Sequence, residues 1–209
     1  MDLAHPMHSV IPSVQGDVLA VLARTQAPLT GRGVAALIDG RASISGVKVA
    51  LRALVASGLV TGESHPPAML YRLNRQHLAA ESIEELANLR GRLLSAMRSL
   101  LSNWVVHAWG AWLFGSAARG DGNVESEIDV LIVRGDGVHA ENETWRRQLD
   151  EFAAATLAWT GNDCRVIEFT ESEFRELLAS PQRLSQALRD DGIALTARRI
   201  SRQPRELVD

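Results

Sequence analysis

The chain has 209 residues, of which 46% are apolar, and its 22 Lys and Arg against 25 Asp and Glu give a net charge of −3. This composition is typical of a globular protein with a hydrophobic core and excludes an intrinsically disordered chain. No apolar run approaches the roughly 20 residues of a membrane-spanning helix, and the first residues lack the basic and apolar regions of a secretory signal. A single Cys excludes an intrachain disulfide. We therefore expect a cytoplasmic protein that does not contact membranes.

The charge divides unevenly along the chain. Residues 1–79 have a net charge of +3, whereas residues 80–209 have a net charge of −6. A length of 209 residues is enough for two small domains. The change of sign therefore predicts two domains that meet different partners.

The N-terminal part is predicted to contain three helices followed by a β-hairpin. The first helix covers residues 16–24, and the second begins with Thr30 as its N-cap and runs to Gly40. After the third helix come two short strand-like segments at residues 59–61 and 69–73, joined by a loop that contains Gly and Pro. Three helices and a hairpin in this order are typical of a winged helix-turn-helix domain.

The third helix carries the residues that we expect to contact DNA. It begins at Ser43 or Ser45 and ends at Gly58. Its apolar stripe at helical spacing consists of Val47, Leu51, Leu54 and Val55. The opposite face, with the residue just before the helix, contains the predicted DNA-binding set Arg41, Ser45, Lys48 and Arg52. Small residues let such a helix approach a major groove, where the basic side chains reach bases or phosphates.

The sequence of residues 45–60, Ser-Gly-Val-Lys-Val-Ala-Leu-Arg-Ala-Leu-Val-Ala-Ser-Gly-Leu-Val, resembles the recognition helix and first wing strand of MarR-like and ArsR-like winged-helix regulators. The resemblance covers about residues 14–75 and implies a winged helix-turn-helix domain over residues 1–79 that binds double-stranded operator DNA. The alternative is a winged helix that is used only for protein contacts.

Residues 80–104 are predicted to form a connecting helix. Apolar residues recur at spacings of three and four from Ile83 to Trp104, which favours one long amphipathic helix over residues 81–104. Its apolar stripe either packs on the flanking domains or pairs with a second copy of the chain. In a homodimer, two recognition helices would meet the half-sites of a palindromic operator.

Residues 105–209 are predicted to form the second domain. Apolar strand candidates cover residues 105–114, 128–133, 164–169 and 193–197. They alternate with helical stretches at residues 141–159, 171–178 and 181–189. The whole chain is therefore expected to be an α+β or α/β protein of two domains, the second a mixed sheet covered by helices.

One strand and the loop after it carry the residues expected to perform chemistry. The strand that ends at Phe114 leads into Gly115 and Ser116, where a Gly lets the backbone approach a ligand and a Ser hydroxyl can hold phosphate. Arg119 adds a charge that binds phosphate. Glu127 and Asp129 are two residues apart on the next strand, so their carboxylates point to the same side. Oxygen ligands beside a phosphate site suit Mg²⁺.

The segments Phe-Gly-Ser-Ala-Ala-Arg-Gly at residues 114–120 and Ser-Glu-Ile-Asp at residues 126–129 resemble the signature of minimal nucleotidyltransferases in the DNA polymerase beta superfamily. The resemblance covers about residues 105–175. It implies that an NTP is bound by Gly115, Ser116 and Arg119. It also implies that Glu127 and Asp129 are the catalytic acids that hold Mg²⁺ or Mn²⁺, with a third carboxylate on a later strand.

The sequence departs from this signature at two positions. Glu127 replaces the usual Asp, and its extra methylene shifts the carboxylate that would hold the metal. Arg165 stands where the third carboxylate is expected, with Asp163 two residues earlier on the same face and Glu168 predicted to face away. The third ligand is then either Asp163, after a small shift, or missing. Both changes argue against efficient two-metal chemistry, and the alternative role of Arg165 is to hold the triphosphate.

Two functions remain open at the level of the sequence. The first is a DNA-binding transcriptional regulator whose nucleotidyltransferase-like domain binds NTP and Mg²⁺ as a sensor, with weak or no turnover. The second is an active Mg²⁺-dependent nucleotidyltransferase that moves NMP from an NTP to a hydroxyl of a protein, an RNA or a small molecule. Because such domains are similar to components of toxin–antitoxin systems, a toxin partner is a further interpretation.

Overall fold

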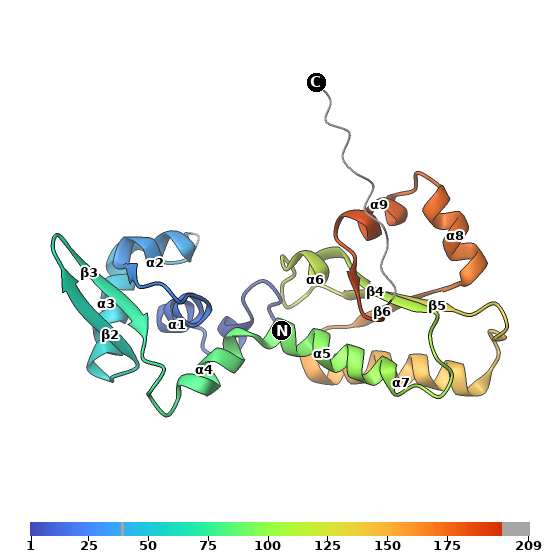
Figure 1. Ribbon diagram of the computed structural model, residues 1–209, viewed down its shortest axis with the longest axis horizontal. Helices are drawn as coiled ribbons and strands as arrows, with labels where there is room; N and C mark the ends of the chain where they lie inside the picture. The colour runs from blue at the N-terminus through green and yellow to red at the C-terminus, as the bar shows by residue number, and fades with distance from the viewer. Residues whose placement is uncertain (39, 198–209) are drawn as a thin grey trace, which may run out of the picture. The chain divides into compact units, whose positions relative to one another are not determined.

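The computed structural model describes residues 1–38 and 40–197. It divides into two compact units, one with Asp2 and Ala4–Arg90, and one with Met1, Leu3 and the chain from Gly91 onward (Figure 1). The last residues of the predicted second domain, 198–209, lie outside the described residues.

The N-terminal unit contains helices in its first part and a hairpin in its second. Its elements before the connecting segment are the 3₁₀ helix η1 (Pro6–Ser9), α1 (Val14–Arg24), β1 (Leu29–Thr30), α2 (Gly31–Leu37), α3 (Ile44–Ala56), β2 (Val60–His65) and β3 (Ala68–Leu73). The helix starts follow from their caps, because the side chains of Ser13, Thr30 and Ser43 accept hydrogen bonds from backbone N–H groups of the first turn. The predicted start at Thr30 is confirmed, and of the two predicted starts of the third helix, Ser43 is the N-cap. The second helix ends at Leu37 rather than at Gly40.

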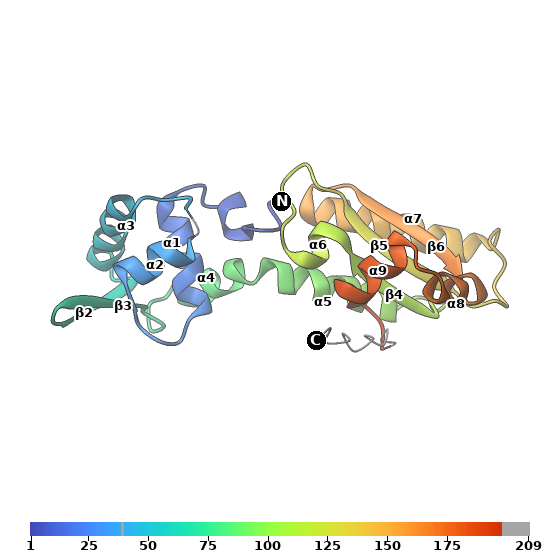
Figure 2. The ribbon, with the colours of Figure 1, turned by 90° about the horizontal axis from the view of Figure 1, so that it is seen from above.

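The hairpin pairs β2 with β3, and β1 pairs with the other side of β3, which gives an antiparallel sheet in the order β1-β3-β2. Figure 2 shows this hairpin extending away from the helices of its unit. The hydrophobic core of this unit is formed by buried side chains of α1, α2 and α3, with Val60 and Leu73 of the hairpin. Val55, predicted to be buried, is instead 38% exposed, because it lies at the edge of the stripe that Val47, Leu51 and Leu54 bury.

The prediction of one helix over residues 81–104 is wrong. The segment forms α4 (Ala80–Ala87) and α5 (Leu89–Ser102), separated at Asn88. The apolar residues of α4 pack in the core of the N-terminal unit, whereas Leu93 and Met97 of α5 pack in the core of the C-terminal unit. The apolar stripe thus packs in the cores of the two flanking units, as the first of the two alternatives predicted. Pairing with a second copy stays a prediction.

The C-terminal unit is built on a mixed sheet, as predicted. Its remaining elements are β4 (Gly110–Phe114), α6 (Gly115–Arg119), β5 (Ile128–Arg134), α7 (Glu143–Thr160), β6 (Cys164–Thr170), α8 (Glu171–Ala179), α9 (Arg183–Asp190) and β7 (Ile193–Ala194). The strand order is β6-β5-β4-β7, with β5 and β6 parallel and the other pairs antiparallel.

Two predicted strands are shorter than expected. The strand predicted over residues 105–114 begins at Gly110, and the one over residues 193–197 ends at Ala194. At the first of these, the backbone N–H groups of Val105 and Val106 donate to Oε1 of Gln148 on α7, at 2.9 and 3.1 Å. These groups are therefore satisfied by a side chain rather than by a neighbouring strand.

Strand β5 is buried on both faces of the sheet. Ile128, Val130 and Ile132 pack with residues of α5 and α7, whereas Leu131 and Val133 pack with residues of α8 and α9. Figure 1 shows the two helix layers on opposite sides of the strands. Side chains alternate along a strand, so even-numbered residues of β5 and β6 face the layer of α5 and α7, and odd-numbered residues face the layer of α8 and α9. In the described part of the chain, no helix has the length and apolar character needed to span a membrane.

Candidate functional site

The first half of the candidate site forms where β4 ends beside the start of β5. Phe114 is in register with Asp129, and the chain then turns at Gly115 with φ +70° to begin α6. A Cβ atom on Gly115 would lie 2.9 Å from Oδ2 of Asp129. Both the left-handed backbone and this close approach require Gly. The Gly115 backbone therefore lies directly against the Asp129 carboxylate.

Asp129 lies between groups of opposite charge. Burial raises the pKa of Asp129 above its ordinary value, the charge of Arg165 acts in the opposite direction, and the charge of Glu127 raises the pKa further. Glu127 is exposed and immediately precedes β5. The site therefore holds two carboxylates that influence each other electrostatically, with a guanidinium beside them.

Strand β6 contributes a cation rather than a third carboxylate. Arg165 is in register with Asp129 in the parallel pair of β5 and β6. Asp163 is exposed just before β6, and its backbone carbonyl accepts a hydrogen bond of 2.8 Å from Ile128 N. Glu168 lies on the opposite face, as predicted, where it pairs with Arg134 and accepts a hydrogen bond from Nε1 of Trp145. Among the described residues, no group of three or more His, Cys, Asp or Glu side chains is arranged to hold a metal ion.

This donor set fits one divalent cation better than two. Mg²⁺ usually binds one or two protein carboxylates and takes its other ligands from water and substrate phosphates. Glu127 and Asp129 provide that number of carboxylates. A second cation close to Asp129 would be repelled by Arg165.

Arg119 and Ser116 lie on α6, immediately after the turn. Nε of Arg119 donates to Asp121 at 2.9 Å and Nη1 donates to Asp191 at 3.2 Å. These two partners raise the pKa of Arg119. The backbone carbonyl of Ser116 accepts hydrogen bonds from the N–H groups of Gly120 and Asp121, which end the helix. The predicted phosphate-binding side chain of Arg119 is therefore held between two carboxylates.

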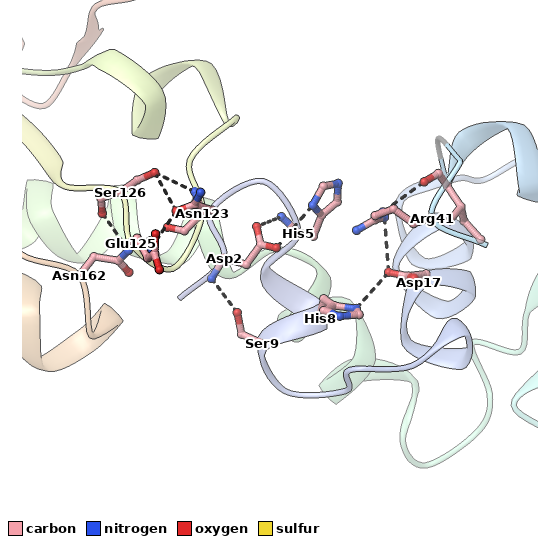
Figure 3. Close-up of polar contacts among 11 residues, drawn as sticks. Asp2, His5, His8, Ser9, Asp17, Arg41, Asn123, Glu125, Ser126 and Asn162 are labelled. Carbon is pink, nitrogen blue, oxygen red and sulfur yellow. Dashed lines mark hydrogen bonds and ion pairs between the residues drawn. The ribbon is translucent and has the colours of Figure 1, made fainter.

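Two residues near the site were not found from the sequence. Asn162 is 2% exposed, and its Nδ2 donates to the backbone carbonyls of Asn123 and Ser126 at 3.1 and 3.0 Å (Figure 3). These bonds hold the loop that precedes Glu127. Asp191, the second partner of Arg119, follows α9, far along the chain from it. The sequence around Asn162 signals only a turn, and nothing in the sequence links Asp191 to Arg119.

A second candidate surface is a groove of about 860 Å³ in the N-terminal unit. Its lining residues are Thr30, Gly31, Arg32, Lys48, Arg52, Pro67, Ala68, Met69 and Tyr71. The groove thus contains Lys48 and Arg52, two of the four residues predicted to bind DNA. It adds Arg32 and Tyr71, which the sequence analysis did not select.

The other two predicted DNA-binding residues lie elsewhere in this unit. Ser45 is exposed in the first turn of α3, where its hydroxyl is 2.9 Å from that of Ser43. Arg41 donates from Nε to the carbonyl of Ile38 at 3.2 Å, and its Nη2 lies 3.4 Å from Oδ1 of the buried Asp17. Neither residue lines the groove.

Residues 92–187 match the family model of the nucleotidyltransferase domain. This segment contains β4, β5 and β6, and all five residues predicted to bind nucleotide or metal, Gly115, Ser116, Arg119, Glu127 and Asp129. The resemblance of the C-terminal part to nucleotidyltransferases is therefore confirmed at the level of the domain. The chain matches no curated protein.

Three solved structures show partial likeness to the chain. The first is a toxin–antitoxin structure with AMP-PNP, at 18% identity over 49% of this chain and 72% of that chain, with a TM-score of 0.34. The second is human N-acetylserotonin methyltransferase in complex with SAM, at 21% identity over 44% of this chain and 31% of that chain, with a TM-score of 0.28. The third is TrmBL2, an archaeal chromatin protein, at 16% identity over 83% of this chain and 74% of that chain, also with a TM-score of 0.28.

The contact of Gly115 with Asp129 gives a prediction for stability. Gly115→Ala places a Cβ against the carboxylate in a left-handed backbone, so we expect a loss of about 1–3 kcal/mol. Gly137→Ala is the control, because no atom lies within 4 Å of its Cβ position. Urea unfolding followed by Trp fluorescence measures the difference, and equal midpoints for the two variants would contradict the close approach.

Proposed function

We propose that this protein is a cytoplasmic DNA-binding transcriptional regulator whose nucleotidyltransferase-like domain binds an NTP with Mg²⁺ and turns it over weakly or not at all. The observation that carries the proposal is the register of Arg165 with Asp129, which puts a cation where a catalytic site would use a third carboxylate. The domain match of residues 92–187 supports the choice of ligand.

In this proposal, the nucleotide lies along the turn at Gly115. The bare backbone of Gly115 and the hydroxyl of Ser116 contact phosphate, and Arg119 leaves Asp121 and Asp191 to bind the triphosphate. Glu127 and Asp129 hold Mg²⁺ or Mn²⁺. When bound, such an ion neutralises phosphate charge and stabilises the charge that develops on a transferring group.

Weak turnover follows from charge. Glu127 and Asp129 supply two negative charges, and Arg165 cancels part of them. An NTP with one cation remains a favourable ligand, because the guanidinium of Arg165 also attracts phosphate. Two-metal chemistry requires a second cation beside the first, and the described site offers no third carboxylate to hold it.

The DNA-binding half of the proposal rests on the N-terminal unit. Its main elements, three helices and then a hairpin, with the short strand β1 between the first two helices, support the proposal because this order is typical of winged helix-turn-helix domains. Lys48 and Arg52 share a groove with residues of the hairpin, so both elements can contact one duplex. A homodimer doubles the positive charge of this domain and presents two recognition helices to a palindromic operator. Nucleotide binding regulates this contact if it favours one conformation of the chain.

A second candidate function is an active nucleotidyltransferase. The domain match and the complete loop from Phe114 to Gly120 favour it. In that reaction, an acceptor hydroxyl of a protein, an RNA or a small molecule attacks the α-phosphorus of the NTP. The bond from the α-phosphorus to the bridging oxygen breaks, pyrophosphate leaves, and the hydroxyl proton is lost to a base.

Substitution of Asp129 separates the two functions. We expect the unmodified chain to bind α-labelled ATP or GTP in the presence of Mg²⁺ without transferring label to total RNA or to proteins of a cell extract. Asp129→Ala removes one of two metal ligands, so we expect binding to weaken at least about tenfold, the value of one charge-assisted contact. Asp150→Ala, an exposed carboxylate on α7, is the matched control.

Filter binding and gel autoradiography provide both readouts. Transfer of label by the unmodified chain and by Asp150→Ala, but not by Asp129→Ala, would contradict the regulator hypothesis and support the active nucleotidyltransferase. Equal nucleotide binding by all three proteins would remove Asp129 from the site.

Substitution of Arg165 tests the observation that carries the proposal. Arg165→Asp adds a third carboxylate in register with Asp129, so we expect transfer of label to appear or to rise at least about tenfold at saturating Mg²⁺. Arg165→Lys keeps the positive charge and is the control. Loss of nucleotide binding in Arg165→Asp with no gain of transfer would mean that Arg165 is only a phosphate ligand.

The DNA-binding half is tested separately. Lys48→Ala and Arg52→Ala each remove a phosphate-seeking charge from the groove. We expect each to weaken binding to a random-sequence duplex about three- to tenfold and to lower the salt slope by about 1. Arg147→Ala, an exposed basic residue on α7, is the control for net charge. Unchanged affinity and salt slope in both groove variants would eliminate this surface as the DNA contact.

A further inference from the structure

The N-terminal unit contains a cavity of about 290 Å³ that is separate from the basic groove. Its walls come from η1 and the residues before it, from α1 and from the end of α2 (residues Ala4, His5, Pro6, Met7, His8, Asp17, Ala20, Val21, Arg24, Thr25, Leu37, Ile38 and Arg41). The volume is close to the lower limit of ordinary small-molecule sites. Most of the wall is apolar, and Met7 and Ile38 are fully buried in it.

A buried carboxylate lies in this apolar wall. Asp17 is 4% exposed, and its Oδ1 is 3.4 Å from Nη2 of Arg41 and 3.5 Å from Nδ1 of His8 (Figure 3). Both distances exceed the roughly 2.7–2.9 Å of a charge-assisted hydrogen bond. Nδ1 of His8 is itself buried without a hydrogen-bond partner among the described residues.

The two contacts of the Asp17 carboxylate are long for ion pairs. A carboxylate has about four acceptor positions, and burial removes the water that would fill them. In the described part of the chain, neither Nη2 of Arg41 nor Nδ1 of His8 makes a hydrogen bond of the usual geometry with the Asp17 side chain, although both lie within 3.5 Å of it. Asp17 is therefore a buried carboxylate, with long contacts to Arg41 and His8, that lines an organic-sized space.

Most polar side chains around the cavity are already engaged with the protein, whereas Nδ1 of His8 has no hydrogen-bond partner among the described residues. Arg24 donates from Nε and Nη2 to the carbonyl of Ala87, at 3.2 and 2.9 Å. The hydroxyl of Thr25 donates to the carbonyl of Val21 at 3.0 Å. Arg41 donates from Nε to a backbone carbonyl, and Nδ1 of His5 lies 3.6 Å from Asp2. A cationic molecule that enters the cavity therefore meets a complementary charge in the Asp17 carboxylate.

We propose that this cavity binds a small organic cation, an amine or amidine on an apolar or aromatic body. The N–H groups of the ligand donate to Asp17, and the body packs on Met7, Val21 and Ile38. The ligand takes the place of Arg41 beside the carboxylate. Because the Arg41 side chain is 32% exposed, it can turn toward water without desolvation.

Apart from Arg41, which also belongs to the predicted DNA-binding set, this site is separate from the surfaces of the functions proposed above. It shares no residue with the groove that contains Lys48 and Arg52, and none with the turn at Gly115. Its success or failure therefore does not decide whether the chain binds DNA or nucleotide.

Benzamidine is the probe, because its planar cation matches a carboxylate with two N–H groups and its ring matches an apolar wall. Calorimetric titration of the full chain is expected to show saturable binding with one site. Benzyl alcohol, which has the same ring without the cation, is expected to bind at least about tenfold more weakly. Absence of saturable benzamidine binding, or equal affinity for the two compounds, would overturn the proposal.

Two variants of opposite effect locate the site. Asp17→Asn keeps the shape of the side chain but removes its charge, so benzamidine affinity should fall at least about tenfold. Arg41→Ala removes the competing cation, so affinity should rise severalfold. Thermal unfolding and circular dichroism verify that each variant is folded. If Asp17→Asn does not fold, the proposal is tested by Arg41→Ala and by the comparison of benzamidine with benzyl alcohol. Unchanged or weaker benzamidine binding by Arg41→Ala would overturn the proposal.

Discussion

The C-terminal unit depends on one constraint, the contact between the Asp129 carboxylate and the bare backbone of Gly115. Asp129 is a polar residue on a strand whose neighbours Ile128 and Val130 are completely buried. Burial of a carboxylate is unfavourable, and the raised pKa of Asp129 records that cost. The strand accommodates the carboxylate at this position because the chain turns at Gly115, which has no side chain to collide with it.

The two pairings of β5 decide what surrounds this carboxylate. Antiparallel pairing with β4 brings the turn and α6 to one side, and parallel pairing with β6 brings Arg165 to the other. The same register sends Glu168 to the opposite helix layer, where it satisfies Trp145 and Arg134. A shift of one residue in the β5–β6 pair would move Arg165 to the other face and change the charge of the site. The chemistry open to this domain is therefore controlled by strand register as much as by residue type.

In the N-terminal unit, in contrast to the carboxylate site of the C-terminal unit, the candidate surface is basic. Its exposed groove contains the basic residues Arg32, Lys48 and Arg52, whereas one of its acidic residues, Asp17 on α1, is buried. Arg41 belongs by sequence to the first group, but its contact with Asp17 draws it to the second. Positive charge near α3 is thus divided between an exposed groove and a cavity whose wall contains the buried carboxylate of Asp17.

Local sequence alone determined the helix caps at Thr30 and Ser43, the mixed sheet, and the turn from Phe114 into Gly115, because caps, alternation and Gly turns depend on residues close together in the chain. It also indicated the nucleotidyltransferase domain from one motif. Tertiary structure decided the break at Asn88, because the apolar spacing is the same on both sides and only the two separate cores divide it. It likewise decided the partners of Arg119, Arg41 and Asn162, because ion pairs and buried amides join residues that the chain brings together only after the sheet and helices have packed.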